Sequence, residues 1–161
     1  MKTINNVTRL LDARKIAYQA LDIPAEKLSA LEVAAFLNVS PAEVFKSIVF
    51  KRAAAGKPVL ALVPAAHEVD AKKLAAALNE KKMLLATQQE AEQLTGLLVG
   101  GISPLALLHR GFQVVLDASA QRKDSIIISA GQRGLQVRLG VPDLARLTQA
   151  HFAQISQSPV D

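Results

Sequence analysis

The sequence predicts an α/β (α+β) fold in which helices surround a mixed, largely antiparallel, barrel-like sheet. Half of the 161 residues are hydrophobic, which suffices for one compact core. Segments with helical periodicity alternate with short apolar strands along the chain. Strand–loop–strand hairpins dominate the centre and the C-terminal part, whereas a doubly wound parallel sheet needs helical crossovers. We therefore expect a single domain over residues 1–161.

The N-terminal part predicts two helices with a strand between them. Residues 5–16 carry apolar side chains at near-helical spacing, and residues 17–23 alternate partially, as a short strand does. Ser29 followed by Glu32 is a capping box, which predicts a second helix to about Asn38.

The centre predicts a β-hairpin after a short helical turn that begins at Ser40. Residues 46–52 and 58–63 are apolar strands, and the loop between them contains Gly56 as the residue that reverses the chain. Lys46 therefore lies where a helical turn meets a strand, and its side chain is expected to be held at the edge of the sheet.

The second half predicts three further helices and four strands. In order, we expect a helix capped by Asp70, a strand at 82–86, a helix from Thr87 to Gly96, strands at 112–116, 125–129 and 136–139, and a helix from Pro142 towards Phe152. A turn at residues 130–134 joins the last two strands. The tail over residues 156–161 is expected to be frayed.

The composition removes several classes of function. The chain has no cysteine, which excludes disulfides, thiolate metal sites and a cysteine nucleophile. Its three histidines, His67, His109 and His151, lack metal-binding spacing, so we expect neither a metal nor a cofactor. No apolar run approaches the ~20 residues of a membrane span, and the polar start resembles no signal peptide. These features predict a cytoplasmic protein without a membrane partner. The net charge of +5 weakly favours nucleic acid as a partner.

Three features could carry chemistry, and each has a purely structural alternative. Lys46 is either a solvated charge at a strand end or a positive charge for a phosphate or an ester carbonyl. The pair Gly100-Gly101 either allows a positive φ or exposes backbone N–H donors to an oxyanion. The segment 129–131 is either a hairpin turn or a source of hydrogen bonds to a ligand. Ser129 lacks the GxSxG elbow and a His–Asp pair, so a serine nucleophile is not favoured.

Sequence motifs around these features occur in a defined order. They are VFKSIVF at 44–50 with GKPVLALVP at 56–64, TGLLVGGISPL at 95–105 and SAGQRGL at 129–135. Together they resemble the motifs of the YbaK/EbsC family, whose members are free-standing relatives of the editing domain in bacterial prolyl-tRNA synthetase. The resemblance runs over nearly the whole chain and implies the YbaK-like fold.

The resemblance implies a trans-editing hydrolase that deacylates misacylated tRNA, with Cys-tRNA(Pro) as the first candidate substrate. Such an enzyme orients the substrate and stabilises an oxyanion, without a metal or a covalent protein nucleophile, while the thiol of the cysteine itself attacks the ester. The alternatives are an Ala-tRNA(Pro)-type deacylase and a non-catalytic module that binds aminoacyl-tRNA or a synthetase. The implied partners are the 3′ acceptor end of tRNA and prolyl-tRNA synthetase.

The resemblance also implies which residues form the site. The implied catalytic residues are Lys46, Gly100 and Gly101. The implied substrate-binding residues are Tyr18, Ser103, Pro104, Ser129 and Gly131. The chain departs from the family pattern at Ala106, where glycine is usual, and at Leu108-His109, where two lysines are usual. These departures leave open which amino acid is removed.

Overall fold

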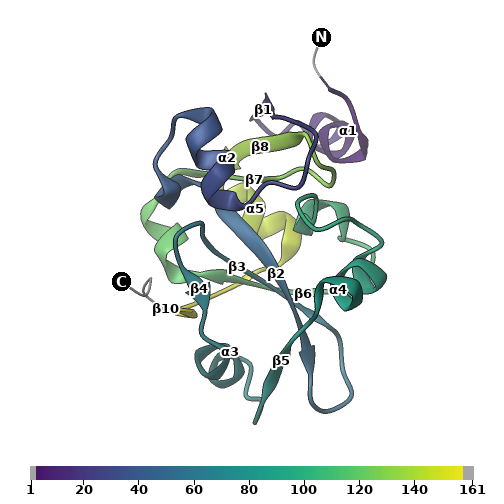
Figure 1. Ribbon diagram of the computed structural model, residues 1–161, viewed down its shortest axis with the longest axis vertical. Coiled ribbons are helices and arrows are strands. Elements are labelled where there is room, and N and C mark those ends of the chain that lie inside the picture. Colours follow the sequence, from purple (N-terminus) through teal and green to yellow (C-terminus); the bar gives the residue numbers. More distant parts are fainter. Residues whose placement is uncertain (1–2, 158–161) are drawn as a thin grey trace.

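The computed structural model describes residues 3–157, in which helices and strands interleave as expected (Figure 1). The α-helices are α1 (Asn6–Ala13), α2 (Ala30–Leu37), α3 (Ala71–Ala77), α4 (Gln88–Thr95) and α5 (Val141–Thr148). Three short 3-10 helices complete the helical elements: η1 (Pro41–Glu43), η2 (Pro104–Ala106) and η3 (Ala118–Arg122).

The strands form three sheets. The five-stranded sheet has the order β5 (Met83–Leu85), β2 (Phe45–Arg52), β3 (Val59–Pro64), β6 (Gln113–Asp117) and β9 (His151–Ala153). The three-stranded sheet has the order β1 (Tyr18–Asp22), β8 (Leu135–Gly140) and β7 (Ser125–Ser129). The third sheet pairs β10 (Ser156–Gln157) with β4 (Glu68–Val69).

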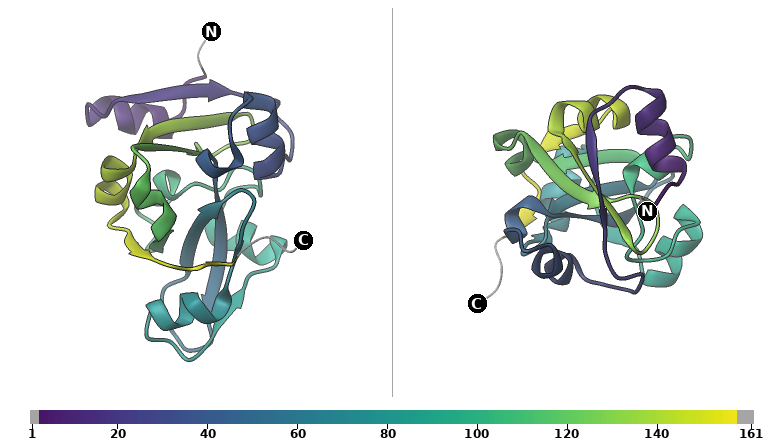
Figure 2. Two further views of the ribbon diagram at one scale, coloured as in Figure 1. Left: turned by 90° about the vertical axis from the view of Figure 1, so that its left-hand side faces the viewer. Right: turned by 90° about the horizontal axis from the view of Figure 1, so that it is seen from above.

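The predicted mixed, largely antiparallel arrangement is confirmed. Only the pairs β3–β6 and β6–β9 are parallel among the strand pairs of residues 3–157. A single parallel bridge between Val44 and Ile127 links the two larger sheets, so the barrel-like arrangement stays open over this part of the chain. Figures 1 and 2 show the three-stranded sheet at one end of the molecule and the tip of the β2–β3 hairpin at the other.

The helices begin and end where local sequence signals place them. In α2, the Ser29 Oγ accepts the Glu32 N–H at 3.1 Å, and the Glu32 Oε1 accepts the Ser29 N–H at 2.9 Å. Thr87 and Glu90 form the same reciprocal pair at the start of α4. Gly96 ends α4 with a φ of 72°, a left-handed conformation that glycine adopts without steric cost.

The core lies on both faces of the central strand β3, whose six residues are all buried. Leu60 and Leu62 pack into the larger cluster, towards the three-stranded sheet. Val59, Ala61 and Val63 point to the opposite face, where they contact α3 and its neighbours. Because successive side chains of a strand alternate between faces, an unbroken apolar run is needed for a strand covered on both sides.

The C-terminal region departs from the sequence-based expectations. The last helix ends at Thr148 and does not reach Phe152, which lies in β9 beside β6. The predicted fraying is wrong for Ser156 and Gln157, because both pair with β4. These partners are distant in the sequence, so local patterns gave no sign of them. Residues 158–161 of the predicted tail lie outside the described part of the chain.

Candidate active site

A cavity of about 510 Å³ lies where the two larger sheets approach each other. Its wall includes several residues of the segment 23–33, the first half of β2, the segment that follows β3, the junction of β5 and α4, and the loop before η2. One residue each of β7 and β8 completes the lining. Most of the lining is apolar. Its polar residues include Lys46, Glu68, Ser47, Ser129 and Gln136.

Lys46 lies at the start of β2, where Val63 of β3 is its partner in the register. Its Nζ donates to the Glu68 Oε1 at 3.1 Å, and the exposed fractions of the two side chains are 21% and 71%. Because Glu68 is mostly in solvent, this ion pair contributes little, below about 1 kcal/mol. An ammonium has three donors, and Glu68 takes the only one that is bonded within residues 3–157. Lys46 can therefore donate to a ligand in the cavity.

Glu68, the ion-pair partner of Lys46, is carried by the pair of strands β4 and β10. In this pair, Gln157 of β10 lies opposite Glu68 of β4. The Asp117 carboxylate holds β10 in place, because its Oδ1 accepts the N–H groups of Ile155 and Ser156 at 3.0 and 3.1 Å. Burial would raise the pKa of Asp117, but these hydrogen bonds and those from Ser119 outweigh it and lower the pKa.

Two serine hydroxyls in the cavity wall are buried without a hydrogen-bond partner among residues 3–157. They are the Oγ atoms of Ser47 on β2 and Ser129 on β7. A buried hydroxyl without a hydrogen bond destabilises a fold by about 1–3 kcal/mol, so each of these two hydroxyls calls for a partner from outside the protein, either a water molecule or a ligand. Sequence reasoning selected Ser129 but missed Ser47, since a lone serine in an apolar strand carries no signal.

Gln136 is a further polar residue that sequence reasoning missed. It lies on β8, opposite Ser129 in the strand register, and is only 4% exposed. Its side chain lines the cavity and makes no hydrogen bond to residues 3–157. Its amide can both donate and accept, so the floor of the cavity offers polar contacts on two adjacent strands.

The two adjacent glycines have different roles. Gly100 lines the cavity with a φ of +98°, and its N–H has no partner within residues 3–157. Gly101 donates its N–H to the Leu98 carbonyl at 2.8 Å, so the expected pair of free adjacent donors is reduced to Gly100. A Cβ on Gly101 would lie 2.8 Å from the Cα and the carbonyl carbon of Gln132. Gly101 therefore allows the turn at 130–134 to pack against this loop.

Ser103 and Pro104 are buried at the end of the loop that carries Gly100, on the side away from the cavity. The Ser103 side chain is fully buried, and its Oγ accepts the Leu105 N–H at 3.2 Å to cap η2. Pro104 is the first residue of η2 and is also buried. Neither residue lines the cavity, so the structure gives both a role in holding the loop.

Tyr18 and Gly131 lie away from this cavity. The Tyr18 hydroxyl donates to the Asp12 Oδ1 at 2.9 Å, and burial together with that carboxylate raises the pKa of Tyr18. Gly131, with a φ of +92°, lines a second cavity of about 410 Å³ between α1 and η2. The positions where the sequence departs from the family pattern, Ala106, Leu108 and His109, line this second cavity as well.

Residues 3–157 contain neither a cluster of metal-ligating side chains nor a membrane-spanning helix. No group of three or more His, Asp or Glu side chains lies close enough to hold a metal ion. None of the helices in this part has the length and apolar character that crossing a membrane requires.

Comparisons with known proteins point to one family. The family model of the aminoacyl-tRNA editing domain matches residues 25–147. The proposed Cys-tRNA(Pro)/Cys-tRNA(Cys) deacylase EbsC of Enterococcus faecalis is 34% identical over 94% of this chain and 92% of its own length. A proline–tRNA ligase of Lactiplantibacillus plantarum is 33% identical over 64% of this chain. This chain spans only 18% of that ligase.

Solved structures share the fold. A hypothetical protein has a TM-score of 0.86 at 23% identity, over 95% of this chain and 100% of its own. A proposed trans-editing enzyme for prolyl-tRNA synthetase has a TM-score of 0.78 at 22% identity, over 97% of this chain and 100% of its own. At these identities the likeness establishes the fold alone.

Proposed function

Because this chain belongs to the aminoacyl-tRNA editing domain family, we propose that it is an aminoacyl-tRNA deacylase that acts in trans on misacylated tRNA. The observation that carries the proposal is the convergence of Lys46, Gly100 and Ser129 on one cavity. These residues come from three distant parts of the chain, and each belongs to one of the three family motifs. A cavity of about 510 Å³ also has the size of sites that hold ligands such as an aminoacyl-nucleoside.

The chemistry of the wall suits ester cleavage. The Lys46 ammonium and the free Gly100 N–H are donors for the oxygen that becomes negative when the ester carbonyl is attacked. The unpartnered hydroxyls of Ser47 and Ser129 can hold the ribose or the amino group of the substrate. Positioning and charge stabilisation together account for catalysis, so no nucleophile from the protein is required.

Cys-tRNA(Pro) is the first candidate substrate, because the EbsC relative is named for that reaction. The cysteine thiol loses its proton and its sulfur bonds to the ester carbonyl carbon. The bond from that carbon to the ribose oxygen then breaks, and the ribose oxygen takes a proton. The cyclic thioester that results is opened by water. For Ala-tRNA(Pro), the alternative substrate, water must attack the ester directly.

Prolyl-tRNA synthetase is the proposed protein partner. This proposal is supported by the identity of 29–41% to segments of several proline–tRNA ligases. An isolated domain that holds only the 3′ end of tRNA cannot distinguish tRNA bodies, so a synthetase would supply that selection. The cytoplasm, where tRNA is charged, is the proposed location.

Deacylation assays against a panel of aminoacyl-tRNAs test the proposal, with Cys and Ala on the proline acceptor included. We expect the fastest release from Cys-tRNA(Pro) and a loss of about 10²-fold in the Lys46→Ala variant, which lacks a charge at the reacting oxygen. Circular dichroism and a melting curve show whether this variant is folded. Lack of release from every member of the panel favours the non-catalytic binding module and refutes the proposal.

A further inference from the structure

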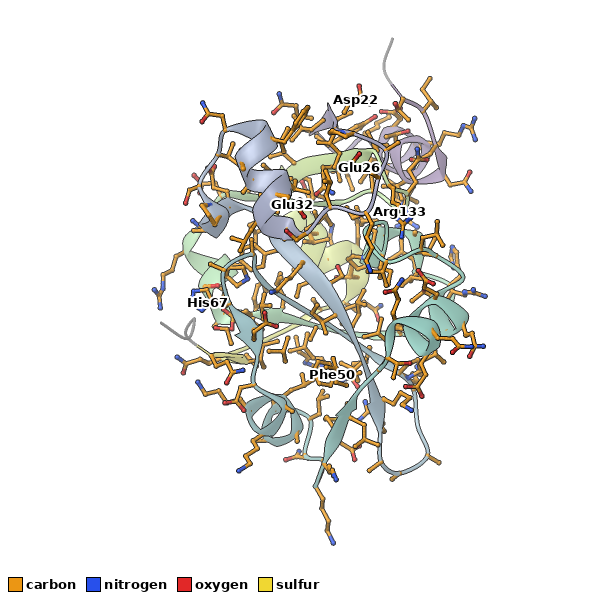
Figure 3. All side chains as sticks on the ribbon, viewed as in Figure 1. Asp22, Glu26, Glu32, Phe50, His67 and Arg133 are labelled. Atoms are coloured by element: carbon orange, nitrogen blue, oxygen red, sulfur yellow. The ribbon has the colours of Figure 1, made fainter. Side chains whose placement is uncertain are left out.

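Two basic residues lie next to Gly100, which lines the cavity. A Cβ placed on Gly100 would lie 3.5 Å from the Cγ and Nε of Arg133 and 3.7 Å from the Cα of Lys27. Both residues therefore lie beside Gly100 of the cavity wall without lining the cavity themselves, although they come from the turn at 130–134 and from the loop before α2. Figure 3 shows Arg133 and Glu26 towards the end of the molecule where the three-stranded sheet lies.

The Arg133 side chain is held so that its guanidinium end is free. Its Nε donates to the Val99 carbonyl at 2.9 Å. This bond fixes the side chain along the loop that carries Gly100 and Gly101, which we call the glycine loop. Neither of its Nη atoms has a hydrogen-bond partner within residues 3–157. A guanidinium whose outer edge presents two N–H groups in one plane matches two oxygens of a phosphate.

Lys27 is placed in a similar way. Its Nζ donates at 2.8 Å to the Oε1 of Gln88, a residue at the start of α4 that lines the cavity. This partner is neutral and uses one of three ammonium donors. The Lys27 charge therefore lies next to a residue of the cavity wall and is not cancelled by its partner.

The nearby carboxylates do not neutralise these cations. Glu32 is bonded to the Ser29 N–H, and Glu92 to the Val99 N–H. Glu26 lines the cavity and is exposed, but its carboxylate lies beyond the 4.0 Å of an ion pair. No ion pair of residues 3–157 includes Lys27 or Arg133, whereas Lys46 inside the cavity is paired with Glu68. Within residues 3–157, the neighbourhood of Gly100 thus contains two basic side chains that form no ion pair.

We propose that Arg133 and Lys27 bind the phosphodiester that joins the last two nucleotides of the tRNA 3′ end. This inference rests on the proposed function, because it assumes that the terminal nucleoside lies in the cavity. The phosphate of a terminal nucleoside held in the cavity lies just outside it. We place it beside Gly100, where Arg133 and Lys27 adjoin the cavity wall. The contact fixes how far the strand enters and so places the ester beside Lys46 and Gly100.

Binding of the single-stranded RNA ACCA, measured by fluorescence anisotropy over a range of salt concentrations, tests this assignment. We expect Arg133→Gln to weaken binding about tenfold and to reduce the slope of log K against log salt by about 0.7, the value for one lost phosphate contact with a single strand. Lys27→Gln should weaken binding by a smaller factor. Arg122→Gln is the matched control, because Arg122 is exposed on η3, an element none of whose residues lines either cavity. Arg133 and Lys27, in contrast, lie beside Gly100 of the cavity wall.

A chemical change in the RNA identifies the phosphate. An ACCA with an uncharged methylphosphonate at the last linkage should bind the wild-type protein at least about tenfold more weakly. The double variant Arg133→Gln, Lys27→Gln, which lacks both cations, should bind this RNA and the natural RNA equally. The loss of affinity caused by the protein substitution and the loss caused by the methylphosphonate should not multiply when the two changes are combined, because groups in contact give non-additive effects. If the two losses do multiply, the assignment is refuted. Equal losses in Arg122→Gln and Arg133→Gln also refute it. If Arg133-dependent binding is found but no tRNA is deacylated, the phosphate site stands and the proposed function fails.

Discussion

Replacement of Gly101 by alanine tests how the glycine loop is held. The added Cβ would lie 2.8 Å from two backbone atoms of Gln132 and 2.9 Å from the Arg133 nitrogen. Ordinary van der Waals contacts of a Cβ begin at 3.4 Å. The obstacle is backbone and not the end of a flexible side chain, so the loop and the turn must separate.

The expected cost follows from that separation. Inserting one methyl group into well-packed structure destabilises a protein by about 1–3 kcal/mol. For a chain of this size, that loss lowers the melting temperature by about 2–12 °C. Activity should fall further than stability does, because the displaced loop carries the Gly100 N–H and the Val99 carbonyl that anchors Arg133.

Gly111→Ala provides the matched control. Gly111 has a φ of +77°, but a Cβ there would meet nothing within 4 Å. This variant has only the backbone strain of a left-handed residue, about 1 kcal/mol, and should keep its deacylation rate. Urea denaturation and deacylation kinetics are measured on both variants and on the wild type. If Gly101→Ala matches the wild type in both measurements, the close approach of the loop and the turn is refuted.

Three further predictions concern Ser129, Asp117 and the synthetase. Ser129→Ala removes a buried hydroxyl that has no protein partner, so we expect unchanged or slightly higher stability in urea but a higher KM for misacylated tRNA; a clear loss of stability would contradict this. Asp117→Asn should lower stability at neutral pH by about 1–3 kcal/mol, because the carboxylate accepts several hydrogen bonds. The folded-state pKa of Asp117 is lowered, so its stabilisation is present above the unfolded-state pKa near 4 and is lost as the pH falls through the folded-state value. Urea melts between neutral pH and pH ~3 should therefore show the difference between Asp117→Asn and the wild type shrinking with acidity, and a constant difference would refute the charge-based explanation. Finally, the isolated protein should deacylate one amino acid equally on two tRNA bodies, and added prolyl-tRNA synthetase should make it selective in the same assay; strong selection without the synthetase would contradict this.

Local sequence signals determined most of the secondary structure. Capping boxes such as Ser29 with Glu32 act over a few residues, and the apolar run of β3 reflects burial on both faces. The β2–β3 hairpin was predictable for the same reason, since its two strands are neighbours in the chain. The order of the three motifs was also readable from the sequence and pointed to the family.

Only the tertiary structure decided which polar groups share the cavity. The sequence pattern selected Lys46, Gly100 and Ser129, but it gave no sign that Ser47 and Gln136 line the same wall or that Glu68 pairs with Lys46. It also placed Tyr18 and Gly131 at the site, whereas the structure puts both outside the first cavity.

The physical reason is the range of the interactions. A capping hydrogen bond or an alternating apolar pattern is complete within one segment, so the segment's own residues determine it. The cavity depends on how the loop at Gly101 packs against the turn at Gln132, and on where β10 pairs with β4. Those contacts join segments far apart in the chain, and their geometry is determined only when the whole core is packed.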